Sequence, residues 1–235
     1  MAPRGASGFY GKLPALGDFV ERALPRAFTA PWDAWLSRAL AESRAQLGDA
    51  WLDVYLTSPL WRFVLSDQAC GAGAWAGVLM PSVDRVGRYF PLTVACPLPL
   101  TVDPLATVCA AAPWYAAVEQ LMLAALDAET LDVEHFAAEL TALAAPDAPP
   151  CEAGPATSLV DGWRLECPPG PPAAPLLGSA LVRGLLPALS LWFNAGAEHA
   201  APVLLAYPGL PAADLYLHLL LGGSDDGTPA AAAAV

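Results

Sequence analysis

The chain has 235 residues, of which 56% are hydrophobic and 14% charged, and its formal net charge is −12. This length allows one large domain or two small ones, each with a real core. The acidic balance argues against nucleic acid as a partner, because neutralising phosphates requires a basic face. The longest apolar runs are shorter than the roughly 18–20 residues of a membrane span, and no hydrophobic signal core precedes Phe9. We therefore expect a cytoplasmic protein without membrane insertion.

The charge is unevenly distributed along the chain. Residues 1–118 contain nine lysines and arginines and nine acidic residues, whereas residues 119–235 contain two arginines and fourteen acidic residues. A local basic patch is therefore possible only in the first half. The five cysteines are odd in number and include no C-x-x-C pair. This favours buried, reduced thiols over a disulfide framework.

In chain order, the first half alternates strands and helices. Residues 8–20 are typical of a strand followed by a glycine-marked turn. Helical spacing of apolar residues predicts a helix from an N-cap at Thr29 to a stop at Gly48. Segments 51–56 and 60–65 are expected to be strands or helix edges. The apolar run at 78–80, which follows an expected flexible glycine-rich loop at 71–77, and the run at 91–100 are predicted strands. The prolines near the end of the second run favour an edge position or an exit from the sheet.

The second half contains helices, strands and proline-rich connections. Helices are predicted from Pro113, over 132–143, within 176–189 and over 211–221, and strands at 158–166, 190–193 and 202–207. Segments 145–155 and 167–175 have the composition of exposed linkers, and 223–235 that of a disordered tail. We predict a single domain over 8–222. The alternation favours an α/β layered fold with helices covering a mixed β-sheet.

A polar loop between the two central apolar runs concentrates charge in a short turn. It carries Asp84, Arg85 and Arg88 next to Ser82. A turn can bring arginines three residues apart together around a carboxylate or phosphate. Structural ion pairs, with Asp18 or a neighbouring turn, are the alternative for each residue taken singly. For the loop as a whole we favour recognition.

Two further charged residues stand in apolar surroundings. Arg62 lies between Trp61 and Phe63, where it either packs through its aliphatic stem or belongs to an anion or carboxylate site. Lys12 is the single lysine of the chain. It is either solvated or faces Asp18 across the first turn.

The sequence contains no catalytic or metal-binding constellation. The motif H-E-x-x-H, paired Cys/His metal spacing and the G-x-S-x-G elbow are absent. The phosphate-loop motif is also absent, and the glycines at 71–77 miss the dinucleotide spacing by one residue. The histidines, His135, His199 and His218, are scattered through the acidic half. We therefore assign no catalytic residue, metal ligand or cofactor, and predict that the protein is not an enzyme.

Several short sequence motifs, which occur in a fixed order, point to a family. GKLPALGDFV at 11–20, PWDAWL at 31–36, SPLWRF at 58–63 and GVLMPSVDRVGRYFPL at 77–92 resemble the bacterial TagF (ImpM-like) family, which is associated with type VI secretion. SLWF at 190–193 is similar to the family's Ser-Leu-Trp-Trp, with Phe193 where the family often has tryptophan. The resemblance is dense over 8–100, thin over 101–189 and weak from Ser190 onward.

The resemblance implies a three-layer α/β/α sandwich. It also implies a cytoplasmic, non-enzymatic accessory protein that represses assembly of the type VI secretion system after translation, by protein–protein binding. The expected partner is the forkhead-associated scaffold protein of the threonine-phosphorylation pathway. Some relatives are fused to a PP2C-type phosphatase domain, for which this chain has no room. A separate phosphatase of the same pathway is therefore a second expected partner.

The family's signature positions include glycines, prolines and tryptophans, which we assign to backbone geometry and packing. The polar signature positions remain, and they define the predicted interaction surface: Lys12, Asp18, Arg62, Ser82, Asp84, Arg85 and Arg88. The alternative is a sensor of phosphorylated ligands or nucleotides, or an uncharacterised hydrolase, that uses Arg62, Arg85 and Arg88.

Overall fold

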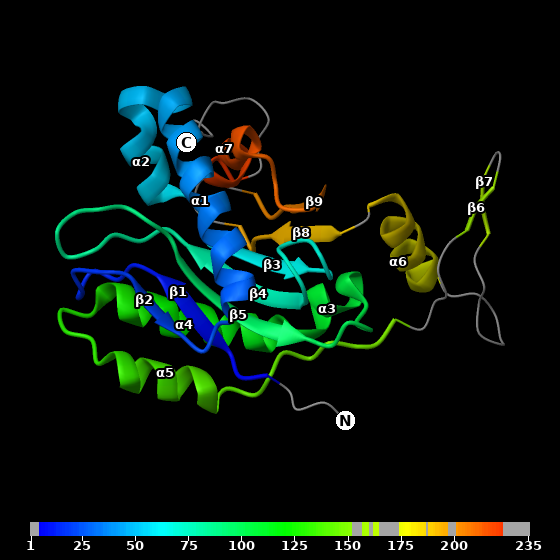
Figure 1. Ribbon diagram of the computed structural model, residues 1–235, viewed down its shortest axis with the longest axis horizontal. Helices are drawn as coiled ribbons and strands as arrows, with labels where there is room; N and C mark the ends of the chain where they lie inside the picture. Colours follow the sequence, from blue (N-terminus) through cyan, green and yellow to red (C-terminus); the bar gives the residue numbers. More distant parts are fainter. Residues whose placement is uncertain are drawn as a thin grey trace, which may run out of the picture.

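The computed structural model describes residues 5–151, 157–159, 162–164, 174–186, 188–196 and 201–222. Seven strands form one sheet in the order β2-β1-β5-β4-β3-β8-β9 (Figure 1). Strands β6 and β7 form a separate pair. The strands are β1 (Gly8–Gly11), β2 (Val20–Arg22), β3 (Trp61–Leu65), β4 (Ala74–Met80), β5 (Leu92–Leu98), β6 (Thr157–Leu159), β7 (Gly162–Arg164), β8 (Leu189–Phe193) and β9 (Leu204–Pro208).

Helices cover both faces of this sheet, which confirms the three-layer α/β/α sandwich (Figure 1). One face carries α1 (Arg26–Leu47), α2 (Trp51–Thr57) and α7 (Tyr216–Leu220), and the other carries α3 (Pro104–Ala110), α4 (Ala112–Asp127) and α5 (Val133–Ala142). Helix α6 (Ala174–Leu185) lies against α3. Two short 3-10 turns are η1 (Gly48–Ala50) and η2 (Ala213–Leu215).

The sheet is antiparallel rather than mixed. Every pair of neighbouring strands in it runs antiparallel. The connections from β1 to β2, β3 to β4 and β4 to β5 are short. Parallel neighbours need a crossover of about a dozen residues or more, so these short connections join antiparallel strands. Strand β5, expected at an edge or an exit of the sheet, lies between β1 and β4. Its single proline, Pro97, comes near its end, where a missing N–H weakens the ladder least. The segment 71–77, expected to be a loop, belongs to β4 from Ala74 onward, because its residues pair with β5.

Two helix predictions also need correction. Helix α1 is capped by Pro25, so that Thr29 lies inside the helix, although Gly48 ends it as expected with φ +53°. Segment 51–56 is helix α2. Its aromatic and aliphatic residues are compatible with a strand or with a helix, and as a helix the segment packs Trp51 and Tyr55 into the core.

An aromatic core fills the space between α1 and the sheet. The ring centroid of Trp32 lies 5.9 Å from that of Trp192 and 5.0 Å from that of Phe63. Nε1 of Trp32 donates to Thr93 Oγ1 over 2.9 Å. A Cβ on Gly77 would stand 2.4 Å from the carbonyl oxygen of Val94. Only glycine therefore lets the central strands approach this closely.

Three of the described cysteines differ in their exposure to solvent. Cys70 and Cys96 are buried free thiols, whereas Cys109 is exposed.

None of the described helices is by itself long and apolar enough to cross a membrane. Helices α3 and α4 reach the required length and apolar composition only as a pair, across a 64° bend. Residues 145–151 run back along 101–103, where Pro149 accepts the amide of Asp103 over 2.8 Å. Predictions for 152–155, 167–173, 223–235 and His199 lie outside the described residues.

Candidate functional site at the β4–β5 loop

The β4–β5 loop, residues 81–91, continues the antiparallel pairing of its two strands as a hairpin. The amide of Asp84 donates to the carbonyl of Arg88 over 3.0 Å, and that of Phe90 donates to Ser82 over 3.1 Å. Gly87 closes the turn, since its amide donates to the Asp84 carbonyl over 2.9 Å and its φ is +83°. Aspartate at the first and glycine at the fourth position are the residues that such a turn prefers.

A buried carboxylate holds this turn in place. Oδ2 of Asp84 accepts from Lys12 Nζ over 2.7 Å and from Arg88 Nε over 2.6 Å. Oδ1 accepts from the amides of Val86 over 3.0 Å and Arg88 over 2.9 Å. The Asp84 side chain is 0% and that of Lys12 6% exposed, so the carboxylate exchanges its water for four protein donors.

The electrostatics of this cluster favour the ionised carboxylate. Burial opposes ionisation of Asp84, but the hydrogen bonds from Lys12 and Arg88 outweigh it and hold the pKa of this carboxyl well below its usual range. Lys12 pairs with Asp84 and not with Asp18. Asp18 instead lies 4.0 Å from Arg88, with 93% of its side chain exposed, a separation and exposure at which an ion pair contributes little.

The loop is also fastened to the β1–β2 connection. Ser82 Oγ donates to the carbonyl of Lys12 over 2.7 Å, and the amide of Arg85 donates to Leu16 over 2.8 Å. Nη2 of Arg88 donates to the carbonyl of Gly17. Side-chain and backbone groups of two distant segments therefore share one hydrogen-bond network.

Tyr55 of α2 fixes the other side of the loop. Its hydroxyl donates to the carbonyl of Ser82 over 2.8 Å and accepts from the amide of the same residue over 3.0 Å. The ring is fully buried and stacks on Trp51 with centroids 4.7 Å apart. The loop thus has a rigid support on both sides.

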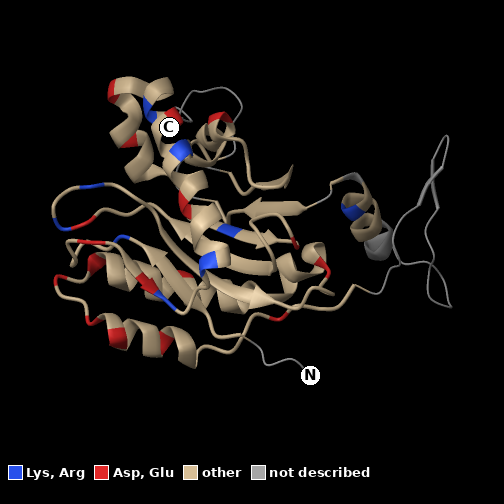
Figure 2. Cartoon of the chain, in the orientation of Figure 1, with Lys and Arg blue, Asp and Glu red and all other residues tan. Residues whose placement is uncertain are grey.

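Four exposed side chains remain at the end of this loop, and we call them the loop-tip surface: Phe19, Arg85, Val86 and Arg88. Val86 is 65% and Phe19 44% exposed. The side chain of Arg85 makes no hydrogen bond or ion pair within the described part of the chain. Figure 2 shows the basic positions on the protruding loop. The surface offers guanidinium groups next to apolar side chains.

Arg62 stands apart from the other predicted residues. Its Nε and Nη2 donate to the two carboxylate oxygens of Glu119 on α4, each over 2.7 Å. Its guanidinium also lies 5.7 Å from the ring centroid of Tyr115. The structure therefore brings together all predicted site residues except this one, which belongs to the interface between the sheet and α4.

Sequence reasoning missed three residues of this site. Phe19 and Val86 lie beside predicted residues in the sequence. Each is an apolar residue inside a charged turn, and this pattern could have identified them. Tyr55 gave no signal, because its segment had the pattern of a strand or a helix edge and its contact with Ser82 spans 27 residues.

The arrangement is suited to binding. The described residues include no group of three His, Cys, Asp or Glu side chains that could hold a metal. The Ser82 hydroxyl is buried and already donates to a backbone carbonyl. The exposed arginines can instead pair with carboxylate or phosphate, while Val86 and Phe19 provide apolar contact.

Fold and loop together define an α/β/α-sandwich protein with a preformed candidate binding loop. The family model of the TagF N-terminal domain, Type VI secretion system-associated, matches residues 8–143, and the chain belongs to this family. The chain is 41% identical to PA0076 from Pseudomonas aeruginosa PAO1, whose crystal structure at 2.05 Å resolution superposes with a TM-score of 0.80. That match covers 94% of this chain and 96% of PA0076. No curated protein matches this chain.

Proposed function

We propose that this chain is a cytoplasmic, non-enzymatic regulator that represses assembly of the type VI secretion system after translation, by binding a protein through its loop-tip surface. The observation that carries this proposal is the Lys12–Asp84–Arg88 cluster. It fixes the loop from within and leaves Arg85 and Val86 exposed. A surface that is ordered before binding loses less entropy when a partner docks.

The proposed partner is the forkhead-associated protein of the threonine-phosphorylation pathway, with a separate PP2C-type phosphatase as a second partner. Membership of a type VI secretion system-associated family supports the pathway. The chemistry of the loop supports an acidic or phosphorylated contact flanked by apolar residues, because arginine binds such groups through paired N–H donors.

The competing function is a sensor of a small phosphorylated ligand or nucleotide, or a hydrolase, built on Arg62, Arg85 and Arg88. The pairing of Arg62 with Glu119 opposes it, since both oxygens of that carboxylate already occupy the guanidinium. This observation favours protein binding at the loop tip over an anion site shared by three arginines.

A pull-down from native cytoplasm tests the proposal. The wild type is compared with Arg85→Ala/Arg88→Ala and with a control, Arg26→Ala/Arg38→Ala, which removes two exposed arginines of α1. We expect the wild type and the control to capture the forkhead-associated protein and the loop variant to lose it. Capture by the wild type and by both variants would show that the loop is not the site. Capture by none would refute this partner.

A further inference from the structure

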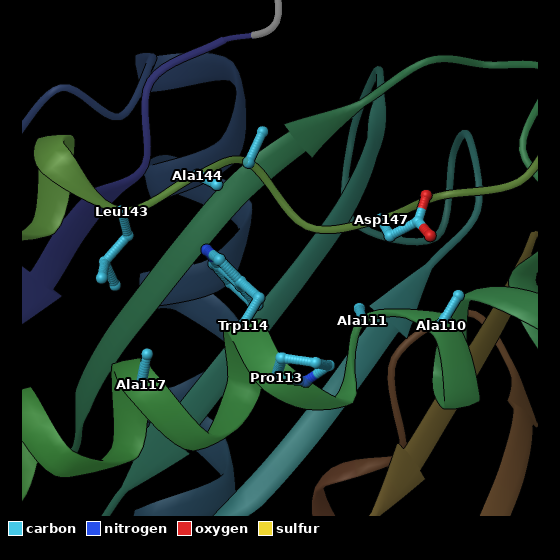
Figure 3. A pocket seen from close by; sticks show the side chains of 9 residues that line it. Ala110, Ala111, Pro113, Trp114, Ala117, Leu143, Ala144 and Asp147 are labelled. Atoms are coloured by element: carbon cyan, nitrogen blue, oxygen red, sulfur yellow. The ribbon is translucent and has the colours of Figure 1, made fainter.

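A second candidate site lies on the opposite face of the sheet from α1. A pocket of about 270 Å³ opens beside the first turn of α4, between this helix and the coil at 143–147 (Figure 3). Apart from Asp147, every residue that lines it is alanine, proline, leucine or tryptophan. The pocket is independent of the loop-tip surface, with which it shares no residue.

The indole of Trp114 forms part of the pocket wall and has an unused donor. Trp114 is 6% exposed, and its Nε1 has no hydrogen-bond acceptor within the described residues. The ring extends from α4 toward the coil that carries Ala144 (Figure 3). Trp75 also lacks an acceptor, whereas the indoles of Trp32 and Trp35 both donate, over 2.9 Å and 2.7 Å.

An unpaired buried donor calls for an acceptor. Buried polar groups in native proteins are nearly always hydrogen-bonded, because desolvation without a partner is unfavourable. The wall that faces the indole is coil, which follows the last residue of α5, Ala142. A shift of this coil would admit an acceptor to Nε1.

Charge decides what kind of acceptor is suitable. Residues 101–150 contain eight acidic residues and no lysine or arginine, and Figure 2 shows acidic positions along α4 and α5. Asp147 is exposed at the rim and makes no ion pair within the described part of the chain. Glu119 and Glu134 of this segment are paired with Arg62 and Arg22, whereas the charge of Asp147 at the rim attracts a cation and repels a carboxylate or phosphate. A neutral carbonyl oxygen with a basic neighbour fits these conditions.

We infer that this pocket binds a short peptide segment of a partner protein, with one large apolar side chain between basic residues. The side chain enters the pocket, a backbone carbonyl beside it accepts the Trp114 indole N–H, and a lysine or arginine faces Asp147. The volume supports a single side chain, since pockets for drug-sized ligands hold about 300 to 1,000 Å³. This is a binding site in addition to the loop-tip surface.

Indole ¹H–¹⁵N spectra of the full chain test the inference. The signal of Trp114 is identified by its loss in Trp114→Phe and independently by its displacement in Ala117→Leu, which fills the pocket. The probe is acetyl-Lys-Phe-Lys-amide. Acetyl-Lys-Ala-Lys-amide removes the apolar anchor, and acetyl-Glu-Phe-Glu-amide reverses the charge. We expect the first peptide to shift this signal with a Kd of about 1 mM and the other two to bind at least about tenfold more weakly.

Matched variants separate the pocket from non-specific contact. Ala117→Leu should abolish the shift, whereas Ala116→Leu, on the exposed side of the same helix, should leave it unchanged. Asp147→Asn should weaken binding of the lysine peptide a few-fold. The inference is overturned if the first peptide leaves the Trp114 signal in place, if all three peptides shift it equally, or if the shift survives in Ala117→Leu.

Discussion

Lys12 and Asp84 are 72 residues apart in the chain, and their side chains meet over 2.7 Å in a site closed to solvent. The pair bridges one strand of the sheet, because β5 lies between the strands β1 and β4 that precede these residues. Desolvation of two charges offsets much of their attraction, so such a pair adds little net stability when it replaces an apolar contact. Its effect here is to fix the position of one loop against another.

Asp84→Asn should destabilise the fold at neutral pH and progressively less in acid. The folded-state pKa of Asp84 lies below the unfolded value of about 3.9. Its ionised form therefore contributes stability above that pH, and the contribution declines as the pH falls below it toward the folded-state pKa. Urea unfolding of both proteins between pH 7 and pH 3 measures the difference.

The matched control for this pH dependence is Asp18→Asn. Asp18 is 93% exposed and 4.0 Å from Arg88, so its replacement should leave the unfolding curve nearly unchanged at every pH. A stability difference between wild type and Asp84→Asn that is the same at pH 7 and pH 3 would contradict the buried, ionised carboxylate.

Arg85→Ala/Arg88→Ala should abolish repression of secretion while the protein remains folded. Arg85 has an exposed side chain without a partner in the described residues, whereas Arg88 also donates to Asp84. The single variant Arg85→Ala should therefore lose repression with no change in Tm. Secretion of a type VI substrate in cells that carry each variant provides the measurement. Full silencing by the double variant would exclude the loop as the acting surface.

Tyr55→Phe should cost about 1–3 kcal/mol of unfolding free energy, because the buried amide of Ser82 loses its acceptor. Tyr89→Phe is the control. Its hydroxyl makes no hydrogen bond within the described residues, so we expect a change below about 0.5 kcal/mol. Chemical denaturation measures both variants, and equal effects would argue against the Tyr55 bridge.

Trp114→Phe should be less destabilising than Trp32→Phe. Both substitutions remove the same atoms, but only Trp32 gives up a hydrogen bond, to Thr93 over 2.9 Å, whereas Trp114 loses a donor without an acceptor. The difference in unfolding free energy should be about 1 kcal/mol or more. A larger loss for Trp114→Phe would mean that its N–H is paired in solution.

Much of the fold followed from local patterns. The apolar runs at 60–65, 78–80 and 190–193 lie in strands, although β4 begins as early as Ala74. The charged segment that follows the second run is a loop, between β4 and β5. The antiparallel arrangement could not be predicted in this way. Strand order depends on pairings such as β3 with β8, which lie far apart in the sequence.

The partners of the charged residues were beyond local patterns for the same reason. Asp18 was the nearest acidic residue to Lys12 across the turn, yet burial of Lys12 required a partner that is buried as well, and Asp84 is that partner. Arg62 points to the face opposite its aromatic neighbours, as strand alternation predicts. Its partner, Glu119, lies 57 residues later in α4.

The affinity of the purified forkhead-associated protein for this chain tests the central proposal most directly. Calorimetric titrations would compare the wild type, Arg85→Ala and Arg38→Ala, the last an exposed arginine on α1. We expect Arg85→Ala to bind about tenfold more weakly or worse and Arg38→Ala to bind like the wild type. Equal affinity of Arg85→Ala and the wild type would contradict binding through the β4–β5 loop.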